Sequence, residues 1–330
     1  MKLLLLVSLA VVASAHARAV AEPEHDYMYF PDGKGELHLI DLKAKPEDLS
    51  SDVTRNVNTI TFNLYTRNNP GTAQILTLNS IASVTGSNFL SSRPTRFVTH
   101  GWNSNQRSDA CVVIRDAYLT AGDYNVIVVD WSSIAGTAYN TASGSVGSVG
   151  GRISAFLDFL NRSAGLNFGT TKLIGHSLGG HIVGIAAQGA SGNIQAVIAL
   201  DPALPGFNNA GAGSGIHESD ADHVQVIHTN AGFLGLSRAA GDSDFYPNGG
   251  RSQPGCGLDL FGACAHSRAY YFFAESILNP TGFPATVTRS QDLEAFIFKS
   301  TVFMGGRTLS THARGSFTLT TASSSPFALG

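Results

Sequence analysis

Residues 172–190 read KLIGHSLGGHIVGIAAQGA, and the order of features within this stretch decides the fold. A short apolar run is followed by the pentapeptide GHSLG (175–179) and then by a helical stretch rich in glycine and alanine. A serine in a G-x-S-x-G pentapeptide of this context sits on a sharp turn, where a Cβ at either glycine would collide with neighbouring backbone. The stretch therefore predicts a strand, an elbow that exposes Ser177, and a helix over residues 178–190.

Further short apolar runs lie on both sides of this stretch, at residues 96–99, 126–129 and 196–200. Their apolar residues do not alternate with polar ones, which is typical of strands buried on both faces, and helical periodicity fills the gaps between them. Upstream, segments 59–66 and 73–78 flank an Asn-Asn-Pro-Gly turn. The fold class expected is α/β: a mainly parallel central sheet with an antiparallel N-terminal hairpin and helices on both faces.

The N-terminus indicates a secreted, extracellular protein. Lys2 precedes an apolar run over residues 3–13, and Ala13-Ser14-Ala15 has the small-x-small pattern of a signal-peptide cleavage site. The run is shorter than the ~20 apolar residues that a membrane-spanning helix needs. We therefore expect a signal peptide at residues 1–15, a polar leader at 16–55 and a single α/β domain at 56–330. Beyond Pro280, the apolar stretches 296–298 and 317–319 are expected to form only a short terminal extension of that domain.

Composition excludes several classes of protein. Of the 330 residues, 14% are charged and 43% are hydrophobic, which excludes intrinsic disorder. The net charge is −3 and the chain has no run of lysine or arginine, so nothing indicates nucleic-acid binding. A neutral or apolar partner is expected.

Serine is a poor nucleophile at neutral pH, so Ser177 needs a base, and the base needs an acid to orient it. Asp201 ends the apolar run 196–200, which places its carboxylate at the same rim of the sheet as Ser177; the alternative interpretation is a turn cap. Chain order in folds of this kind is serine, acid, histidine. That order leaves five histidines, which are His217, His223, His228, His266 and His312. The pattern favours His228, which closes a strand, and His266, which is expected on a loop just before a helix over about residues 267–278, without separating them.

A second loop is expected to approach the serine. Residues 96–102 read RFVTHGW, an apolar run that ends in Gly101 and Trp102. Gly101 lets the backbone come close to a substrate, so the main-chain N–H groups of Trp102 and of Leu178 are the expected oxyanion donors. The alternative is a strand-end turn with a buried aromatic side chain.

The chain has three cysteines. Cys256 and Cys264 are close enough in sequence to close a short disulfide loop, which an oxidising compartment permits. Cys111 borders the apolar face of a helical pattern and is predicted to be a buried, unreactive thiol.

Seven blocks of sequence resemble the pancreatic (neutral) lipase family, especially its small secreted single-domain members such as insect gut lipases and phospholipase A1-like enzymes. The blocks are RFVTHGW (96–102), VVDW (128–131), GHSLGGH (175–181), LDPA (200–203), VIHT (226–229), DFYPNGG (244–250) and CAHSR (264–268). The resemblance implies an α/β-hydrolase fold with Ser177 as nucleophile, Asp201 as acid and His266 as base, and it gives His228 a structural role. It implies a secreted lipase that hydrolyses phospholipids, galactolipids or acylglycerols at a micelle or membrane surface, without a cofactor.

The sequence also departs from the larger members of that family. The chain ends before a C-terminal β-sandwich domain could begin, so no colipase partner is expected. Only residues 257–263 lie between Cys256 and Cys264, the positions that bound the lid of the larger lipases, which is too short for an amphipathic helix. A small lid predicts a site that is open in water. Only Asp220 matches a calcium ligand of the larger lipases and His217 replaces a carboxylate, so no metal is expected.

Two alternatives remain on the sequence alone. One is a catalytically inactive lipid-binding or yolk-type storage protein on the same fold, against which the three competent triad residues count. The other is a general carboxylesterase. The sequence indicates no oligomeric state.

Overall fold

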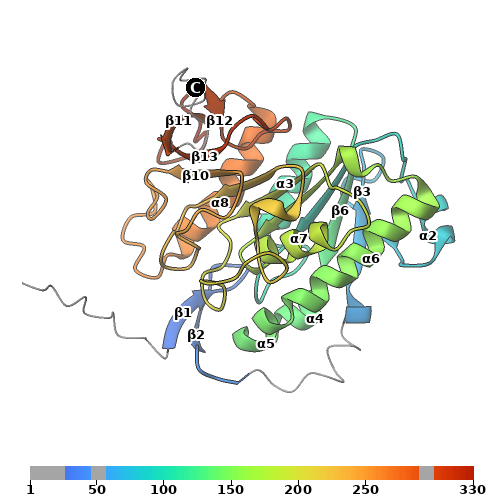
Figure 1. Ribbon diagram of the computed structural model, residues 1–330, viewed down its shortest axis with the longest axis horizontal. Helices are drawn as coiled ribbons and strands as arrows, with labels where there is room; N and C mark the ends of the chain where they lie inside the picture. The colour runs from blue at the N-terminus through green and yellow to red at the C-terminus, as the bar shows by residue number, and fades with distance from the viewer. Residues whose placement is uncertain (1–26, 46–56, 290–300) are drawn as a thin grey trace, which may run out of the picture.

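The computed structural model describes residues 27–45, 57–289 and 301–330. Its strands are β1 (Tyr27–Pro31), β2 (Leu37–Asp41), β3 (Thr61–Tyr65), β4 (Gln74–Leu76), β5 (Thr95–Thr99), β6 (Asn125–Asp130), β7 (Thr171–His176), β8 (Ala196–Leu200), β9 (Val224–Ile227), β10 (Ser243–Pro247), β11 (Pro284–Arg289), β12 (Val302–Phe303) and β13 (Gly315–Leu319). Eleven of them form one sheet in the order β12-β11-β13-β10-β9-β8-β7-β5-β6-β3-β4 (Figure 1).

The sheet is mostly parallel, as the sequence predicted. Strands β6, β5, β7, β8, β9, β10 and β13 run parallel to one another, whereas the pairings β6–β3 and β3–β4 at one edge and β13–β11 and β11–β12 at the other are antiparallel. The expected N-terminal hairpin of the sheet is therefore confirmed as β3–β4. Because parallel strands end at the same edge, β7 and β8 carry their last residues to one rim.

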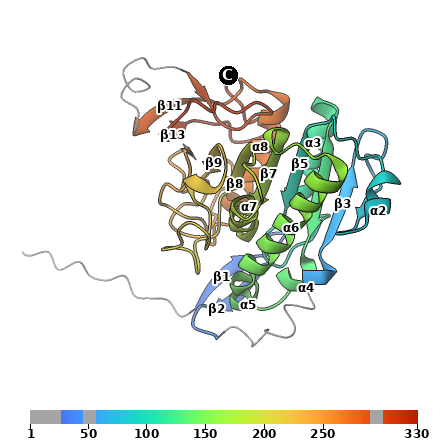
Figure 2. The ribbon, with the colours of Figure 1, turned by 45° about the vertical axis from the view of Figure 1, so that its right-hand side comes forward.

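Helices cover both faces of this sheet. They are α2 (Ile81–Thr85), α3 (Asp109–Ala121), α4 (Ser132–Ala135), α5 (Tyr139–Gly144), α6 (Val146–Ala164), α7 (Leu178–Gln188) and α8 (Ala263–Leu278), with short 3₁₀ turns η1 (Val57–Thr59), η2 (Phe168–Thr170) and η3 (Glu218–Asp220). Helices α6 and α7 pack on one face within one hydrophobic cluster, and α3 and α8 pack on the other face within a second cluster (Figure 2).

Helix α6 shows how the apolar pattern determines the packing. Its buried face carries the residues expected from the helical period, which are Val149, Ile153, Phe156, Leu157 and Leu160. The ring of Phe156 stacks on that of Phe62 from β3, with the centroids 3.7 Å apart. Burial of each of these large side chains stabilises the fold by about 1.5–3 kcal/mol.

A second hairpin, β1–β2, precedes the main sheet and forms a two-stranded sheet of its own. Its turn is closed by Asp32, whose Oδ1 accepts the backbone N–H groups of Lys34 (2.8 Å) and Glu36 (2.9 Å). Gly35 supplies the positive φ of +82° that the turn requires. This hairpin lies within the segment expected only as a polar leader; residues 16–26 and 46–55 of that leader lie outside the described residues.

The chain after residue 280, expected as a short terminal extension, instead continues the main sheet. Strand β13 pairs parallel with β10, and β11 pairs antiparallel with β13. The apolar stretch 296–298 and the signal peptide predicted at residues 1–15 lie outside the described residues. Within residues 27–45, 57–289 and 301–330, no helix has the length and apolar character needed to cross a bilayer.

Candidate active site

Ser177 lies at the sharp turn between β7 and α7, as the pentapeptide predicted. Its backbone has φ +57° and ψ −124°, a conformation that side-chain-bearing residues rarely adopt. The flanking glycines make the turn possible, because a Cβ on Gly175 would overlap the carbonyl of Gly179 and one on Gly179 would lie 2.6 Å from the His100 carbonyl oxygen. The elbow thus depends on two glycines and holds the serine at the carboxyl end of the sheet.

Asp201 follows the last residue of β8 at the same rim. Its backbone N–H donates to the Ile227 carbonyl at 2.7 Å. Oδ1 of its carboxylate accepts the backbone N–H groups of Thr229 at 2.8 Å and Asn230 at 2.9 Å. A Cβ on Gly235 would lie 2.6 Å from Oδ2, so a glycine is needed beside the carboxylate. The two amide donors fix the carboxylate and leave Oδ2 free for a further partner.

That partner is His266, whose Nδ1 lies 2.6 Å from Oδ2 of Asp201. The sequence placed His266 on a loop, which is wrong: helix α8 begins at Ala263, so His266 lies in its first turn, where its N–H donates to the Gly262 carbonyl. With Nδ1 on the acid, Nε2 is the atom left to act on Ser177.

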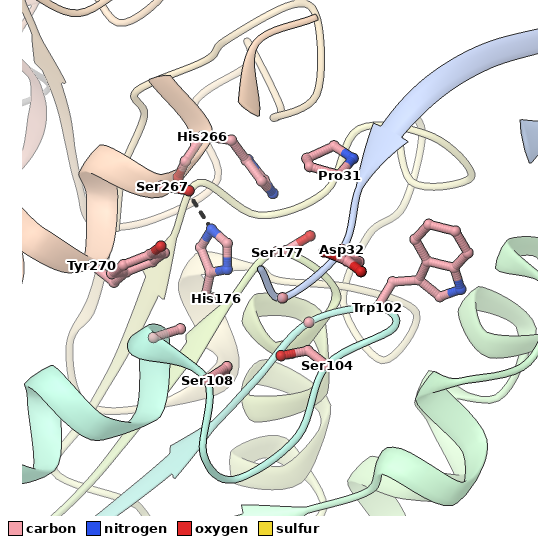
Figure 3. A pocket seen from close by; sticks show the side chains of 13 residues that line it. Pro31, Asp32, Trp102, Ser104, Ser108, His176, Ser177, His266, Ser267 and Tyr270 are labelled. Atoms are coloured by element: carbon pink, nitrogen blue, oxygen red, sulfur yellow. Dashed lines mark hydrogen bonds between the residues drawn. The ribbon is translucent and has the colours of Figure 1, made fainter. Parts of the chain in front are cut away.

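Ser177 and His266 line one small cavity (Figure 3). The serine Oγ and the imidazole Nε2 are both buried, and neither has a hydrogen-bond partner among the described residues. Buried polar atoms are normally paired, so an unpaired hydroxyl and an unpaired imidazole nitrogen at one cavity mark a site built for chemistry rather than for stability.

His176 is a residue of this site that the sequence did not single out. Its Nε2 donates to the carbonyl oxygen of His266 at 3.1 Å, and its ring also packs on Tyr270. Burial first, and then the neighbouring His266, lower the pKa of His176 well below its ordinary value of 6.5, so the ring is neutral at neutral pH. The sequence feature that could have identified His176 is its position in the pentapeptide GHSLG, because the residue before Ser177 lies next to the residue that acts on the serine.

The other candidate bases lie elsewhere. His228, which the sequence left open beside His266, bonds through Nε2 to Asp244 at 2.8 Å and through Nδ1 to the Leu236 carbonyl at 2.8 Å. Its ring stacks flat on Tyr246. These contacts use both ring nitrogens, so His228 has a structural role, as the resemblance implied.

The loop that carries Trp102 approaches the serine as expected. A Cβ on Gly101 would lie 2.7 Å from Cβ of Ser177, so only glycine permits this approach. The Trp102 indole donates to the Thr137 carbonyl at 2.8 Å, which fixes the loop. Leu178 is the first residue of α7, where backbone N–H groups have no partner within the helix.

The hairpin β1–β2 covers this cavity. Pro31, Asp32 and Gly33, at the end of β1 and the start of its turn, line the cavity together with Ser177 and His266. Ser177 is 2% exposed and His266 is 3% exposed. The site expected to be open in water is therefore largely covered, because the hairpin β1–β2 lies over it.

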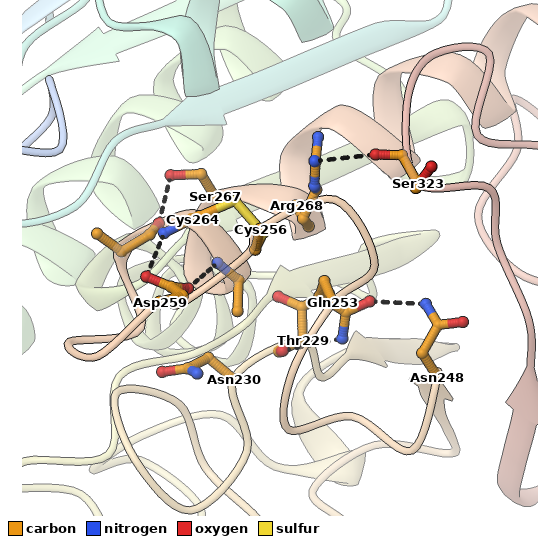
Figure 4. Close-up of a disulfide and its surroundings, with 12 residues drawn as sticks. Thr229, Asn230, Asn248, Gln253, Cys256, Asp259, Cys264, Ser267, Arg268 and Ser323 are labelled. Carbon is orange, nitrogen blue, oxygen red and sulfur yellow. Dashed lines mark hydrogen bonds between the residues drawn. A yellow bond between two sulfur atoms is a disulfide. The ribbon is translucent and has the colours of Figure 1, made fainter.

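The predicted disulfide joins Cys256 to Cys264 at the start of α8 (Figure 4). Within its loop, Asp259 accepts the backbone N–H groups of Cys264 and Ala265, which caps the helix that carries His266. Cys111 is a free, fully buried thiol, as predicted, and burial raises its pKa to about 12.

The two residues weighed as metal ligands contact each other. The backbone N–H of His217 donates to Oδ2 of Asp220 at 2.8 Å, and His217 Nδ1 lies 2.9 Å from the Ser219 hydroxyl. Burial raises the pKa of Asp220 to about 6. One carboxylate in this setting is a poor match for calcium, which takes six to eight oxygen ligands.

A model of the Lipase family matches residues 40–301, and the chain therefore belongs to this family. Among its relatives, the pancreatic triacylglycerol lipase of Myocastor coypus is 36% identical over 265 residues, which cover 73% of this chain and 56% of that protein. The human pancreatic triacylglycerol lipase is 35% identical over 252 residues, with 69% and 54% covered. The inactive pancreatic lipase-related protein 1 of Mus musculus is 36% identical over 246 residues, with 68% and 52% covered.

The chain spans about half the length of the curated relatives it matches. Among solved structures, it is similar to MGS-M1, an α/β hydrolase from a deep-sea metagenome library, with 18% identity, a TM-score of 0.33 and coverage of 54% of this chain and 73% of that one. The esterase Est1E of Butyrivibrio proteoclasticus gives a TM-score of 0.30 at 18% identity, with 44% and 51% covered. The α/β-hydrolase fold is assigned from the family match and from the order of the strands in the sheet, not from these two solved structures.

Proposed function

We propose that this chain is a secreted serine hydrolase that cleaves carboxylic esters of lipids. One observation carries the proposal: Asp201 holds Nδ1 of His266 at 2.6 Å, while Nε2 of that histidine and Oγ of Ser177 lie at one cavity without a hydrogen-bond partner among the described residues. A hydroxyl, an imidazole and a carboxylate in this order form the chain of proton transfer that activates a serine.

In the first half-reaction, Oγ of Ser177 attacks the carbonyl carbon of the ester, and its proton passes to Nε2 of His266. Asp201 keeps the imidazole in the tautomer with Nδ1 protonated and stabilises the imidazolium that forms. The tetrahedral intermediate collapses when His266 returns the proton to the leaving alcohol. An acyl group is then bound to Ser177 as an ester.

In the second half-reaction, water takes the place of the alcohol. His266 accepts a proton from the water as it attacks the acyl-enzyme, and the fatty acid leaves as Ser177 recovers its proton. The negative oxygen of both intermediates is held by the backbone N–H groups of Leu178 and Trp102. Each such donor is worth about 3–4 kcal/mol of transition-state stabilisation.

A fluorophosphonate probe tests the proposal directly, because only an activated serine displaces its fluoride and binds the phosphorus through Oγ. Labelling should occur at Ser177, and Ser177→Ala should abolish it together with at least about a thousandfold of the esterase activity. Ser104→Ala, which removes another hydroxyl from the same cavity, is the matched control and should still be labelled. An unlabelled wild-type protein would contradict the proposal.

The second candidate function is that of a catalytically inactive member of the family, and one observation favours considering it. The inactive relative from Mus musculus is as similar to this chain as the triacylglycerol lipases are. Overall similarity therefore does not separate active from inactive members. The fluorophosphonate experiment does, since an inactive protein leaves Ser177 unlabelled.

The substrate class is proposed to be a phospholipid, galactolipid or acylglycerol at a micelle or membrane surface, with no cofactor, colipase or nucleic acid as partner. Hydrolysis rates on phosphatidylcholine, a galactolipid, triolein and a water-soluble ester, measured side by side, test this choice. A rate that is high only on the soluble ester indicates a general carboxylesterase instead. Secretion is tested by expressing the full chain in cultured cells and sequencing the N-terminus of the protein in the medium.

A further inference from the structure

The cavity at Ser177 is too small for the substrate of the proposed reaction. Its volume is about 20 Å³. A single ordered water needs at least ~10–15 Å³ by the same measure, whereas pockets that enclose an organic ligand run to several hundred. An ester with an acyl chain cannot reach Ser177 unless part of the cavity wall moves away.

One side of the cavity wall belongs to the main domain, and the other side belongs to the hairpin β1–β2. The side of the main domain is built from strand ends and helix starts, among them His176, Ser177 and the first turn of α8. The other side is Pro31, Asp32 and Gly33 of the hairpin β1–β2 (Figure 3). Among the described strands, β1 and β2 pair only with each other, so the hairpin can move without breaking a strand ladder of the main sheet.

The inner face of the hairpin is docked on the site. The Phe30 ring is 1% exposed and meets the His266 imidazole edge-on, with the centroids 5.8 Å apart. The same ring contacts Trp102 and Tyr139. At the turn, the N–H of Gly33 donates to the Asn103 carbonyl at 3.1 Å. These contacts place an aromatic side chain where a substrate would approach the base.

The outer face of the same hairpin is also apolar. Tyr27 and Leu39 are each 58% exposed, and Tyr29 and Leu37 lie on the same face of the strands, as the pairing of Tyr29 with Leu39 requires. Hairpins that face water on one side normally carry polar residues there. A two-sided apolar hairpin is built to contact apolar material on both sides.

The outer face continues onto the disulfide loop. The ring of Tyr29 meets that of Phe261 with the centroids 4.8 Å apart, and the same loop carries Leu260, 66% exposed, and Leu258, 85% exposed. Exposed apolar side chains therefore lie on both the cover of the cavity and the loop beside it. This arrangement suits the surface of a lipid aggregate, into which apolar residues can insert.

We infer that the hairpin β1–β2 is a displaceable cover of the catalytic cavity, and that a lipid surface displaces it by binding its outer apolar face. The inference rests on the proposed function for its substrate but not for the closure itself. In water the inner contacts of Phe30 and Gly33 hold the hairpin closed. At a lipid surface the outer face exchanges water for lipid, and this shifts the equilibrium toward the open form.

A substitution at Gly33 tests the closure. A Cβ at this position would lie 2.6 Å from Cβ of Ser104, so Gly33→Ala should weaken docking of the hairpin. We expect the fluorophosphonate to label Gly33→Ala about tenfold faster than wild type in buffer without lipid. The double variant Gly33→Ala/Ser104→Gly removes the Ser104 side-chain atoms from the collision and leaves only the Cα of residue 104 at 3.0 Å, so the labelling rate should return part of the way toward that of wild type. Gly71→Ala is the control, because no atom of the described part of the chain lies within 4 Å of the added Cβ.

A second pair of variants tests the lipid surface. Phosphatidylcholine vesicles should raise the labelling rate of wild type several-fold and that of Gly33→Ala by less, since the latter is already open. Tyr27→Ser/Leu39→Ser, which changes two outer-face residues that are each 58% exposed, should keep the wild-type rate in buffer and lose the increase with vesicles. Ile75→Ser, which removes an exposed apolar side chain from the distant edge strand β4, should keep the increase.

The outcomes separate the cover from the proposed function. Labelling of Gly33→Ala at the wild-type rate or slower, with an unchanged melting temperature, would show that the hairpin is a fixed wall of the site and would overturn the inference. Labelling that vesicles do not change in wild type would overturn the lipid trigger. Absence of labelling in every variant, including Gly33→Ala, would instead refute the proposed function.

Discussion

The imidazoles of His176 and His266 lie with their centroids 4.4 Å apart, and Nε2 of the first donates to the backbone carbonyl of the second. The residue before the nucleophile thus supports the residue proposed as its base. Because burial keeps His176 neutral, it contributes a hydrogen bond to the first turn of α8 without a competing charge.

Replacing His176 should therefore lower kcat more than it raises KM. His176→Ala removes this hydrogen bond and the ring that packs on the His266 imidazole, so the imidazole can shift, and a shift on the order of 1 Å costs about 100-fold in rate. His176→Gln keeps an N–H donor and should recover part of kcat. Steady-state kinetics on a soluble ester measure both effects, and equal kcat for the two variants would argue against a positioning role.

Gly235→Ala should disable the site through Asp201. The added Cβ would lie 2.6 Å from Oδ2 of the carboxylate, which displaces the oxygen that His266 needs. We expect kcat to fall by about 100-fold or more and the free energy of unfolding to fall by about 1–3 kcal/mol. Gly147→Ala, in an exposed turn of α6 with nothing within 4 Å, should be active and slightly more stable. An active Gly235→Ala would contradict this account of Asp201.

Asp220 should make the stability of the protein pH-dependent. Its pKa in the folded state, about 6, is above its ordinary value of 3.8, so folding favours the protonated form. The stabilisation is complete below pH 3.8 and is lost as the pH rises through 6, a loss of about 2–3 kcal/mol. Asp220→Asn should therefore be more stable than wild type at pH 8 and equal to it near pH 4.

Denaturant unfolding at several pH values measures this difference. The exposed neighbour variant Asp222→Asn is the control and should follow wild type at each pH. EDTA should change neither curve. A loss of stability in Asp220→Asn at pH 8, together with destabilisation of wild type by EDTA, would show that Asp220 holds a cation.

Removing the disulfide should reduce both stability and activity. Cys256 and Cys264 are eight residues apart, and a loop of this length stabilises the folded state by about 2–3 kcal/mol. The Cys256→Ser/Cys264→Ser variant also loosens Asp259, which caps the helix that carries His266, so kcat should fall as well. Cys111→Ala removes a buried thiol that is not part of the disulfide and does not line the cavity, and it should cost stability while leaving kcat unchanged, as thermal melts and initial rates would show.

The sheet and the elbow could be predicted because their signals are local. The strand, pentapeptide and helix over residues 172–190 encode the turn at Ser177 in consecutive residues, and the apolar runs of the parallel strands need no distant partner to be recognised. The base could not be chosen from the residues alone. His228 and His266 both have an aspartate partner, and only tertiary packing decides that Asp201 meets His266 and Asp244 meets His228.

The cover was missed although its strands carry a readable pattern. Residues 27–31 and 37–41 flank the turn DGKG (32–35), a hairpin signal that lies between polar segments. Docking of the hairpin depends on Phe30 meeting Trp102 and His266, contacts between segments far apart in the chain. The early start of α8 was missed for a similar reason, since its cap comes from Asp259 in the disulfide loop rather than from the periodicity of the helix.

The positive φ of Ser177 has a consequence for anyone who engineers this protein toward heat tolerance. A residue with a side chain at φ +57° and ψ −124° costs on the order of 1–3 kcal/mol, and glycine would remove the cost. A screen that selects for thermal stability alone would thus favour Ser177→Gly, a more stable variant that lacks the nucleophile. At this residue the backbone conformation that the reaction needs lowers the stability of the fold. A selection for thermal stability must therefore also measure catalytic turnover.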